Sequence, residues 1–155
     1  MKNPEKDRYW IVARDKPGLL TAMMRALAGG AHISFEGNLS RCTFAEMLGP
    51  TTDETPSLMR STSHPRQDFV VLPLEPECVQ PILDAVLPNN RFMTDIIHIQ
   101  IERAGKLEFG SYDNFHPECI VAFHGVSTEL LDQLQNRGVI RSWTEPYAGA
   151  TRWHG

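Results

Sequence analysis

The fold is decided by residues 9–33, whose sequence is YWIVARDKPGLLTAMMRALAGGAHI. Its opening residues are largely aromatic or β-branched and predict a strand. A DKPG turn follows, in which Asp15 suits a helix cap and Pro17 suits a first helical turn. Apolar residues then recur at helical spacing until a glycine pair ends the helix. From His32 onward polar and apolar residues alternate, so the stretch predicts a strand, a helix and a second strand.

A long polar insert follows at residues 43–67. It contains Pro50, Pro56 and Pro65 among many Thr, Ser, Asp and Glu residues, with room for a short helix around residues 44–48. Structureless loops of this length are uncommon inside compact domains. We therefore expect the insert to be either mobile or functional.

Beyond the insert the pattern of strands and helices resumes. Residues 69–74 predict a strand, and apolar residues at helical spacing predict a helix from Pro76 to a turn at residues 88–90. In the next strand isoleucines alternate with His98, Gln100 and Glu102. The order up to Arg103 predicts an α+β, ferredoxin-like βαββαβ sheet with its helices on one face. The polar face of that sheet must meet water, another subunit or the C-terminal third.

The C-terminal third repeats part of this theme. It predicts strands at residues 107–112, 119–123 and 139–143, with a helix between the last two that is capped by Ser127 or Thr128 and ended by Gly138. We therefore expect three parts. They are an ACT-like domain at residues 1–104 that carries the insert, a βαβ extension or incomplete second ACT-like unit at 105–145, and a tail at 146–155.

Composition excludes several classes of protein. The chain is 41% hydrophobic and 22% charged with a formal net charge of −4, and it has no basic stripe that would indicate nucleic-acid binding. No apolar run is long enough to span a bilayer, and Met1 to Arg8 lacks the apolar core of a signal peptide. The three cysteines form no CxxC pair, so we expect neither a disulfide framework nor a zinc ribbon. These features favour a cytoplasmic protein without a membrane or nucleic-acid partner.

Residues 9–33 resemble the opening strand, helix and strand of ACT domains, which are regulatory modules found in, for example, phosphoglycerate dehydrogenases and aspartate kinases. The signature of that family is an apolar strand, a D/N-x-P-G-hydrophobic turn, an amphipathic helix and a small-residue exit into the next strand. The resemblance is tight over this stretch and continues loosely, as the order of elements, to Arg103. The matching residues are Asp15, Pro17, Gly18, Leu19, Leu20 and Ile33.

The resemblance implies an amino-acid pocket where the DKPG turn faces another subunit. A glycine at this turn lets a ligand approach the backbone, and the N–H groups of a first helical turn favour a carboxylate. The family places polar side chains at the positions of Asp15 and His32, often asparagine at both, and another where this chain has Ala13. The expected ligand-binding residues are Asp15, Lys16, Pro17, Gly18, Leu19 and His32.

These observations predict a regulatory module that binds an amino acid or a related small metabolite and is not an enzyme, with no cofactor and no metal. We expect a homodimer, because edge strands such as the second one present unpaired backbone groups and because family pockets resemble clefts between subunits. Simpler roles stay open. Asp15 can serve only as a helix cap, Gly18 only as a site of close packing, and His32 only as a solvated strand residue.

Two other functions also stay open. His116, Cys119 and His124 are the compact group of candidate metal ligands or nucleophile–base pairs, and they would serve a small hydrolase or transferase. Their spacing matches no familiar zinc set, and Cys119 opens an apolar strand, where an inert thiol is expected. The sequence has no phosphate-binding glycine loop, G-x-S-x-G elbow or H-E-x-x-H helix. The last alternative is a structural interaction module without a ligand.

Overall fold

The three elements predicted for residues 9–33 are present in the computed structural model as β1 (Tyr9–Ala13), α1 (Lys16–Leu27) and β2 (Ala31–Gly37). The structure describes residues 8–44, 47, 49–87, 94–147 and 149–152. Helix α1 is followed by Gly29 and Gly30, whose φ angles are 112° and 64°. Side chains disfavour such positive φ angles, so the glycine pair is what turns the chain from α1 into β2.

The remaining elements follow the predicted order. They are β3 (Asp68–Leu74), a short 3₁₀ helix η3 (Pro76–Cys78), α2 (Val79–Val86), β4 (Ile96–Arg103), β5 (Lys106–Ser111), β6 (Ile120–Ala122), α3 (Thr128–Asn136) and β7 (Ile140–Thr144). Ser127, one of the two predicted caps, accepts a hydrogen bond from the Leu130 N–H at 3.2 Å. The predicted turn at residues 88–90, and residues 45, 46 and 48 of the short helix expected in the insert, lie outside the described residues.

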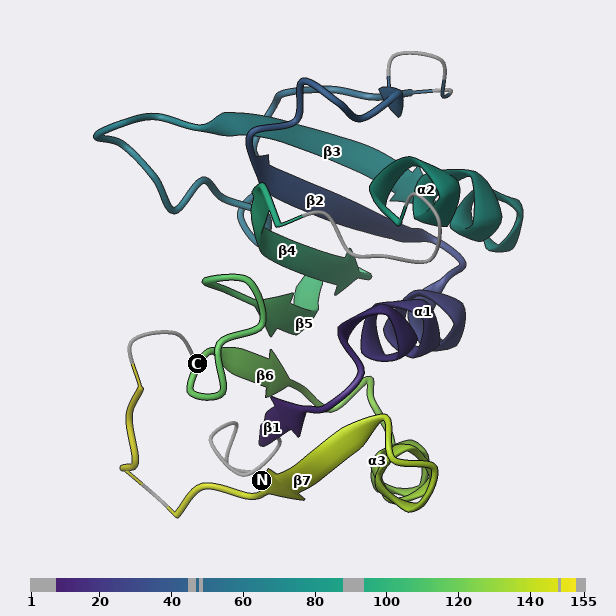
Figure 1. The fold of residues 1–155 in the computed structure, drawn as a ribbon, viewed down its shortest axis with the longest axis vertical. Coiled ribbons are helices and arrows are strands. Elements are labelled where there is room, and N and C mark those ends of the chain that lie inside the picture. Colours follow the sequence, from purple (N-terminus) through teal and green to yellow (C-terminus); the bar gives the residue numbers. More distant parts are fainter. Residues whose placement is uncertain (1–7, 45–46, 48, 88–93, 148, 153–155) are drawn as a thin grey trace.

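The strands form one antiparallel sheet, which within the described residues has seven strands in the order β3-β2-β4-β5-β6-β1-β7 (Figure 1). A ferredoxin-like sheet would pair β1 with β3 and β4. Here β2 occupies that central place, and β1 lies between β6 and β7. The class α+β is confirmed and the ferredoxin-like order is not. The physical reason is that β6 and β7 hydrogen-bond to both edges of β1.

The sheet has two halves of similar construction. In one half α2 connects β3 to β4 across β2, and in the other α3 connects β6 to β7 across β1. Both halves are βαβ crossovers with an antiparallel strand inserted between the parallel pair, and β5 joins them through β4 and β6. The C-terminal third therefore extends the sheet on both sides of β1, through β6 and β7.

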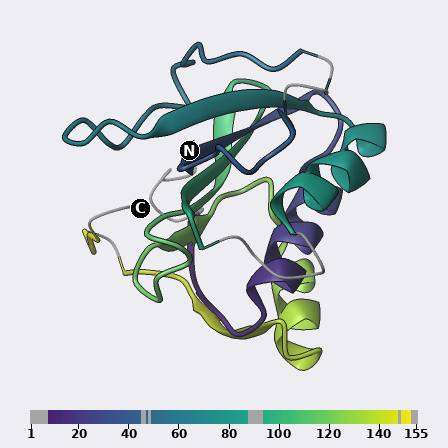
Figure 2. The ribbon, with the colours of Figure 1, turned by 45° about the horizontal axis from the view of Figure 1, so that its top comes forward.

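The helices α1, α2 and α3 cover one face of the sheet, as predicted for α1 and α2 (Figure 2). Their apolar sides and the inward side chains of the strands form a single buried cluster. Its members include Leu19, Met23, Leu27, Ile33, Phe35, Ile82, Ile99, Ile101, Phe109, Leu131, Leu134 and Ile140. This core fixes the start of α1 against the end of β1.

The opposite face carries the polar side chains of β2 and β4, and the insert covers part of it. Glu36 is 1% exposed, and its carboxylate accepts hydrogen bonds from the N–H groups of Ser61 (2.9 Å) and Thr62 (3.0 Å) and from the Thr62 hydroxyl. Gln100 donates to the carbonyl of Met59 at 2.9 Å. The insert was not among the partners predicted for this face. It packs there because the buried carboxylate and amide need hydrogen-bond partners that its backbone supplies.

The expectation that β2 is an edge strand is wrong, because β3 and β4 pair with its two sides. The outer strands of the sheet are β3 and β7. On β3 the backbone of Val71 exchanges two hydrogen bonds with Thr51 of the insert, at 2.7 and 3.0 Å. This bridge blocks the middle of the β3 edge.

Candidate functional site

Asp15 caps α1 and uses the N–H groups of its first turn. Its Oδ1 accepts a hydrogen bond from Gly18 N at 3.0 Å, and its carbonyl accepts from Leu19 N at 2.9 Å. Pro17 has no N–H to offer. A ligand carboxylate was expected at the N–H groups of this turn, but those of Gly18 and Leu19 already donate to Asp15. The negative group beside the turn is the carboxylate of Asp15 itself, which favours a cationic partner over a second carboxylate.

Gly18 leaves room for that carboxylate. A Cβ at this position would lie 2.4 Å from Asp15 Oδ2, which is closer than real Cβ contacts occur. Leu19, another residue of the predicted site, is 0% exposed and lies in the hydrophobic core. Of the DKPG turn and its neighbour, Asp15 and Lys16 are the residues whose side chains are exposed.

His32 does not lie with this turn. It follows the C-terminal end of α1, whose 12 residues correspond to about 18 Å of helix. The side chain of His32 is 50% exposed, and its Nδ1 lies 3.8 Å from a Glu102 carboxylate oxygen. The structure thus places Asp15 and His32 at opposite ends of one helix and does not bring them together.

The neighbour of the DKPG turn is a left-handed turn that the sequence pattern did not indicate. Lys16 Nζ donates to Asn114 Oδ1 at 2.8 Å. Asp113, Asn114 and Phe115 all have positive φ, between 52° and 59°, and His116 N donates to Tyr112 O at 3.2 Å across them. Asparagine and aspartate tolerate this conformation, whereas phenylalanine rarely adopts it. Backbone strain of this kind concentrates at binding and switch regions.

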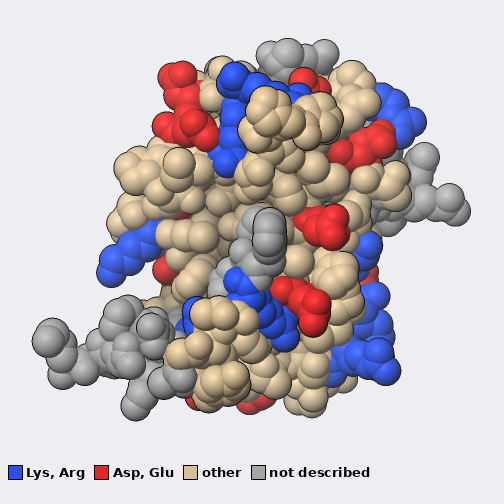
Figure 3. Space-filling view, turned by 90° about the vertical axis from the view of Figure 1, so that its left-hand side faces the viewer, with Lys and Arg blue, Asp and Glu red and all other residues tan. Residues whose placement is uncertain are grey.

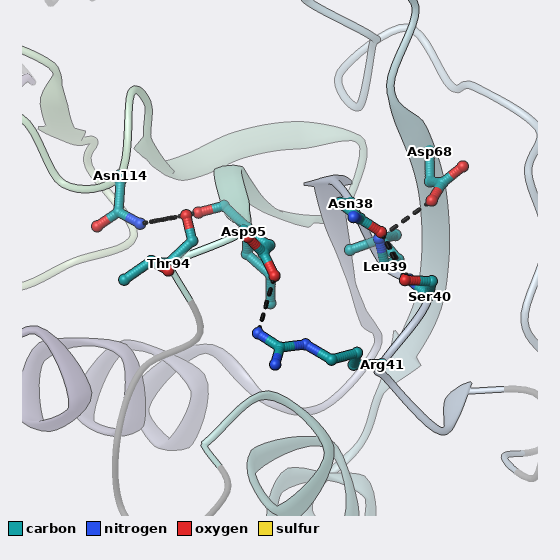
Figure 4. A network of polar contacts seen from close by, with 9 residues as sticks. Asn38, Leu39, Ser40, Arg41, Asp68, Thr94, Asp95 and Asn114 are labelled. Carbon is teal, nitrogen blue, oxygen red and sulfur yellow. Dashed lines mark hydrogen bonds and ion pairs between the residues drawn. The ribbon is translucent and has the colours of Figure 1, made fainter.

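Asn114 ties the left-handed turn to the start of β4. Its amide Nδ2 donates to the carbonyls of Thr94 at 3.2 Å and Ile96 at 3.1 Å (Figure 4). Beside Thr94, the Asp95 carboxylate forms an ion pair with Arg41 at 3.0 Å. A continuous series of polar contacts therefore runs from Lys16 through Asn114 to the start of β4 and on to the segment after β2.

A buried polar group lies behind the same turn. His98 accepts a hydrogen bond at Nδ1 from Asp113 N at 3.1 Å, and its ring lies 5.5 Å from that of Tyr112. Burial lowers the pKa of His98, although the nearby carboxylates of Glu36 and Asp113 act in the opposite direction. Burial, with a contribution from Glu36, raises the pKa of Tyr112 to about 12. Both side chains are therefore neutral near pH 7, and they stabilise the turn by packing and hydrogen bonding.

Of the alternative cluster, the structure brings His116 and Cys119 together, and His124 follows at the other end of β6. His116 Nδ1 accepts from the Glu118 N–H at 3.1 Å, and Cys119 Sγ lies 3.9 Å from the same nitrogen. Burial raises the pKa of Cys119, Asp113 and Glu118 raise it further, and Arg152 lowers it. A nucleophilic thiol needs a lowered pKa. His124 lies beyond the far end of β6.

Charge and metal-ligand patterns add no second site. On the face shown in Figure 3, lysine and arginine side chains are interspersed with aspartate and glutamate. Among the residues described, no group of three or more His, Cys, Asp or Glu side chains is arranged to hold a metal ion. Within the same ranges, every helix is too short or too polar to span a bilayer.

Comparisons with protein-family models, characterised proteins and solved structures find no match to this chain. The assignment of a function therefore depends on the residues and their geometry.

Proposed function

We propose that this protein is a regulatory module that binds an amino acid or a related small polar metabolite at Asp15, Lys16 and Asn114. We call these three residues the α1 site. The observation that carries the proposal is the 2.8 Å hydrogen bond between Lys16 and Asn114, which joins an exposed charged pair to a strained turn. The resemblance of residues 9–33 to ACT domains points to the same turn.

The chemistry of the α1 site matches a zwitterion. The Asp15 carboxylate suits an ammonium group, and the adjacent Lys16 ammonium suits a carboxylate. Asn114 offers an amide that donates and accepts hydrogen bonds. Because Asp15 and Lys16 are exposed, each ion pair contributes little, and we expect weak binding suited to sensing abundant metabolites.

Binding acts through a choice between two arrangements of the Lys16 side chain. A ligand carboxylate competes with Asn114 for the Lys16 ammonium, and a released Asn114 loosens the left-handed turn and its contacts with the start of β4. The ion pair between Asp95 and Arg41 connects the start of β4 to the segment after β2. A ligand shifts such an equilibrium only by its difference in affinity for the two states.

The proposal also includes a homodimer in a reducing compartment, with subunit contacts that respond to the ligand. The three cysteines are all free. Strand β7 is an outer strand of the sheet, and outer strands present backbone groups to other chains. No catalytic step is part of this function.

A thermal-shift screen with the twenty amino acids tests the proposal. At about ten times its dissociation constant a ligand stabilises the folded state by about 1.4 kcal/mol, which raises Tm by about 3–6 °C in a chain of this size. Asn114→Gly keeps the positive φ and removes the partner of Lys16, while Lys16→Gln removes the charge. Both variants should change the rise in Tm that the ligand causes, and His32→Ala should leave that rise intact.

The absence of a shift with any amino acid would contradict the proposed function. A shift that survives Lys16→Gln but disappears in His32→Ala would move the site to the other end of α1. Sedimentation velocity with and without the active amino acid measures the subunit contact, and an unchanged sedimentation coefficient would refute the regulatory part.

A further inference from the structure

A cavity of about 280 Å³ lies between η3, α2, the outer strand β3 and the insert. Leu72 and Ile82 are buried and form its apolar floor. The remaining lining residues are Met47, Pro73, Glu77, Cys78 and Pro81. Small-molecule sites usually enclose about 300–1,000 Å³, so this cavity suits a molecule with one ring or one branched chain.

Two prolines line the cavity. Pro73 has no N–H, so β3 cannot pair with a further strand at this point. Pro81 lies in the first turn of α2, where proline is tolerated and presents a rigid apolar ring.

The insert supplies an anchored wall. Phe44 stacks on Phe35 of β2 with ring centroids 5.3 Å apart, and Met47 N donates to Phe44 O at 3.0 Å. Phe44 is buried in the main core. Met47 is thereby held at the cavity, and its flexible side chain can adapt to the shape of a guest.

The mouth of the cavity is acidic. Glu77 is exposed and forms no ion pair within the described part of the chain. An apolar interior beneath a carboxylate favours a ligand that has an apolar portion and a positively charged group.

We propose that this cavity is a second binding site, separate from the α1 site, that takes a small organic cation such as an arylalkyl or branched aliphatic primary amine. The apolar body occupies the space above Leu72 and Ile82, and the ammonium group pairs with Glu77. The corresponding amino acid binds less well, because its carboxylate would meet Glu77 at the mouth. The proposal does not depend on the proposed function of the α1 site.

Cys78 lines the cavity, so the rate at which its thiol is modified can show whether a ligand occupies the cavity. Cys42 and Cys78 are half-buried and Cys119 is buried, so a Cys42→Ala variant leaves Cys78 as the more accessible thiol. The test measures iodoacetamide modification of Cys78 by peptide mass spectrometry, with phenethylamine, phenylacetate or phenylalanine present. Thermal shift with the same three compounds gives a second readout that does not depend on the thiol.

Phenethylamine should slow modification of Cys78 in a saturable way at concentrations of about 1 mM, as expected for a ligand of this size. Phenylacetate has the same body and the opposite charge, and it should give no protection. Glu77→Gln should weaken the apparent affinity for phenethylamine about two- to five-fold, since it removes one exposed ion pair. Asp84→Asn, which changes an exposed carboxylate of α2 outside the cavity, should have no effect.

Equal protection by phenethylamine and phenylacetate would overturn the proposal, and so would protection by neither. An affinity for phenethylamine that is unchanged in Glu77→Gln would also overturn it. Because Lys16→Gln disables the α1 site and leaves this cavity intact, protection of Cys78 by phenethylamine in that variant separates the two sites.

Discussion

Glu36→Gln is the substitution for which the structure predicts the clearest consequence. The Glu36 carboxylate is almost fully buried and receives the backbone N–H groups of Ser61 and Thr62 on its two oxygens, together with the Thr62 hydroxyl. Glutamine has nearly the same shape. It keeps one oxygen as an acceptor and replaces the other with an NH₂ group, which faces an N–H donor.

The size of the effect follows from these contacts. One charge-assisted hydrogen bond, worth about 1.5–3 kcal/mol, is lost, and the remaining ones lose the charge of the acceptor. We expect the free energy of unfolding to fall by about 2–4 kcal/mol, out of about 5–15 kcal/mol for a typical domain. The loss should be concentrated in the insert, because its backbone supplies the donors.

Urea denaturation measures the global loss, and limited trypsin digestion measures the local one. Cleavage after Arg60 and Arg66 of the insert should accelerate in Glu36→Gln under native conditions. Glu54→Gln is the matched control. Glu54 is exposed and accepts from Arg60 N at 2.6 Å, so its replacement should change stability by less than about 0.5 kcal/mol. Stability within about 0.5 kcal/mol of the parent for Glu36→Gln, with unchanged trypsin cleavage, would refute the anchoring role of this carboxylate.

Three further predictions follow from single residues. Gly37→Ala should destabilise the protein by about 2–4 kcal/mol in urea denaturation, because its φ is 149° and a Cβ would lie 2.2 Å from the Asp95 carbonyl oxygen; an unchanged midpoint would contradict this. Burial lowers the pKa of folded His98, so the unfolded chain binds a proton more readily below about pH 6.5 and stability should fall as the pH drops from about 7 towards 5. His98→Gln should flatten that dependence, and an equally steep profile would exclude His98 as its source. Cys119 should be the slowest thiol towards iodoacetamide at pH 8, since it is buried and its pKa is raised; fast labelling would revive the enzyme alternative.

Local structure could be predicted from the sequence because each decisive signal is a short-range one. The cap at Asp15 and the glycine pair after α1 act within a few residues of themselves, and the alternation around Ile99 reports one buried face. These features follow from backbone geometry and from exposure to water. They require no knowledge of what lies across the sheet.

Strand order could not be predicted in the same way. The pattern of β1 is equally suited to pairing with β3 and β4 or with β6 and β7, and the choice depends on contacts more than a hundred residues apart along the chain. Placement of the insert over Glu36 was missed for a related reason. An acidic residue in an alternating strand normally faces water, and nothing near it in the sequence indicates donors 25 residues away.

The candidate site was predicted in part. Asp15 and Lys16 are exposed at the turn where the resemblance to ACT domains places a ligand, whereas Leu19 is buried and His32 lies at the far end of α1. The sequence does not indicate Asn114, because a run of left-handed residues without glycine has no reliable sequence signal. The dipeptide Asp113-Asn114 is the one local feature that could have suggested it, since both residue types tolerate positive φ.

The position of β1 has a consequence for how the protein is made. A ribosome delivers the first strand early and its two neighbours last, so nascent β1 has no permanent partner until β6 and β7 have left the exit tunnel. During that interval Ile11 and the side chains beside it are exposed to other molecules. We therefore expect shortened products that end before β6 to aggregate or to be degraded, because their β1 lacks both of its partners.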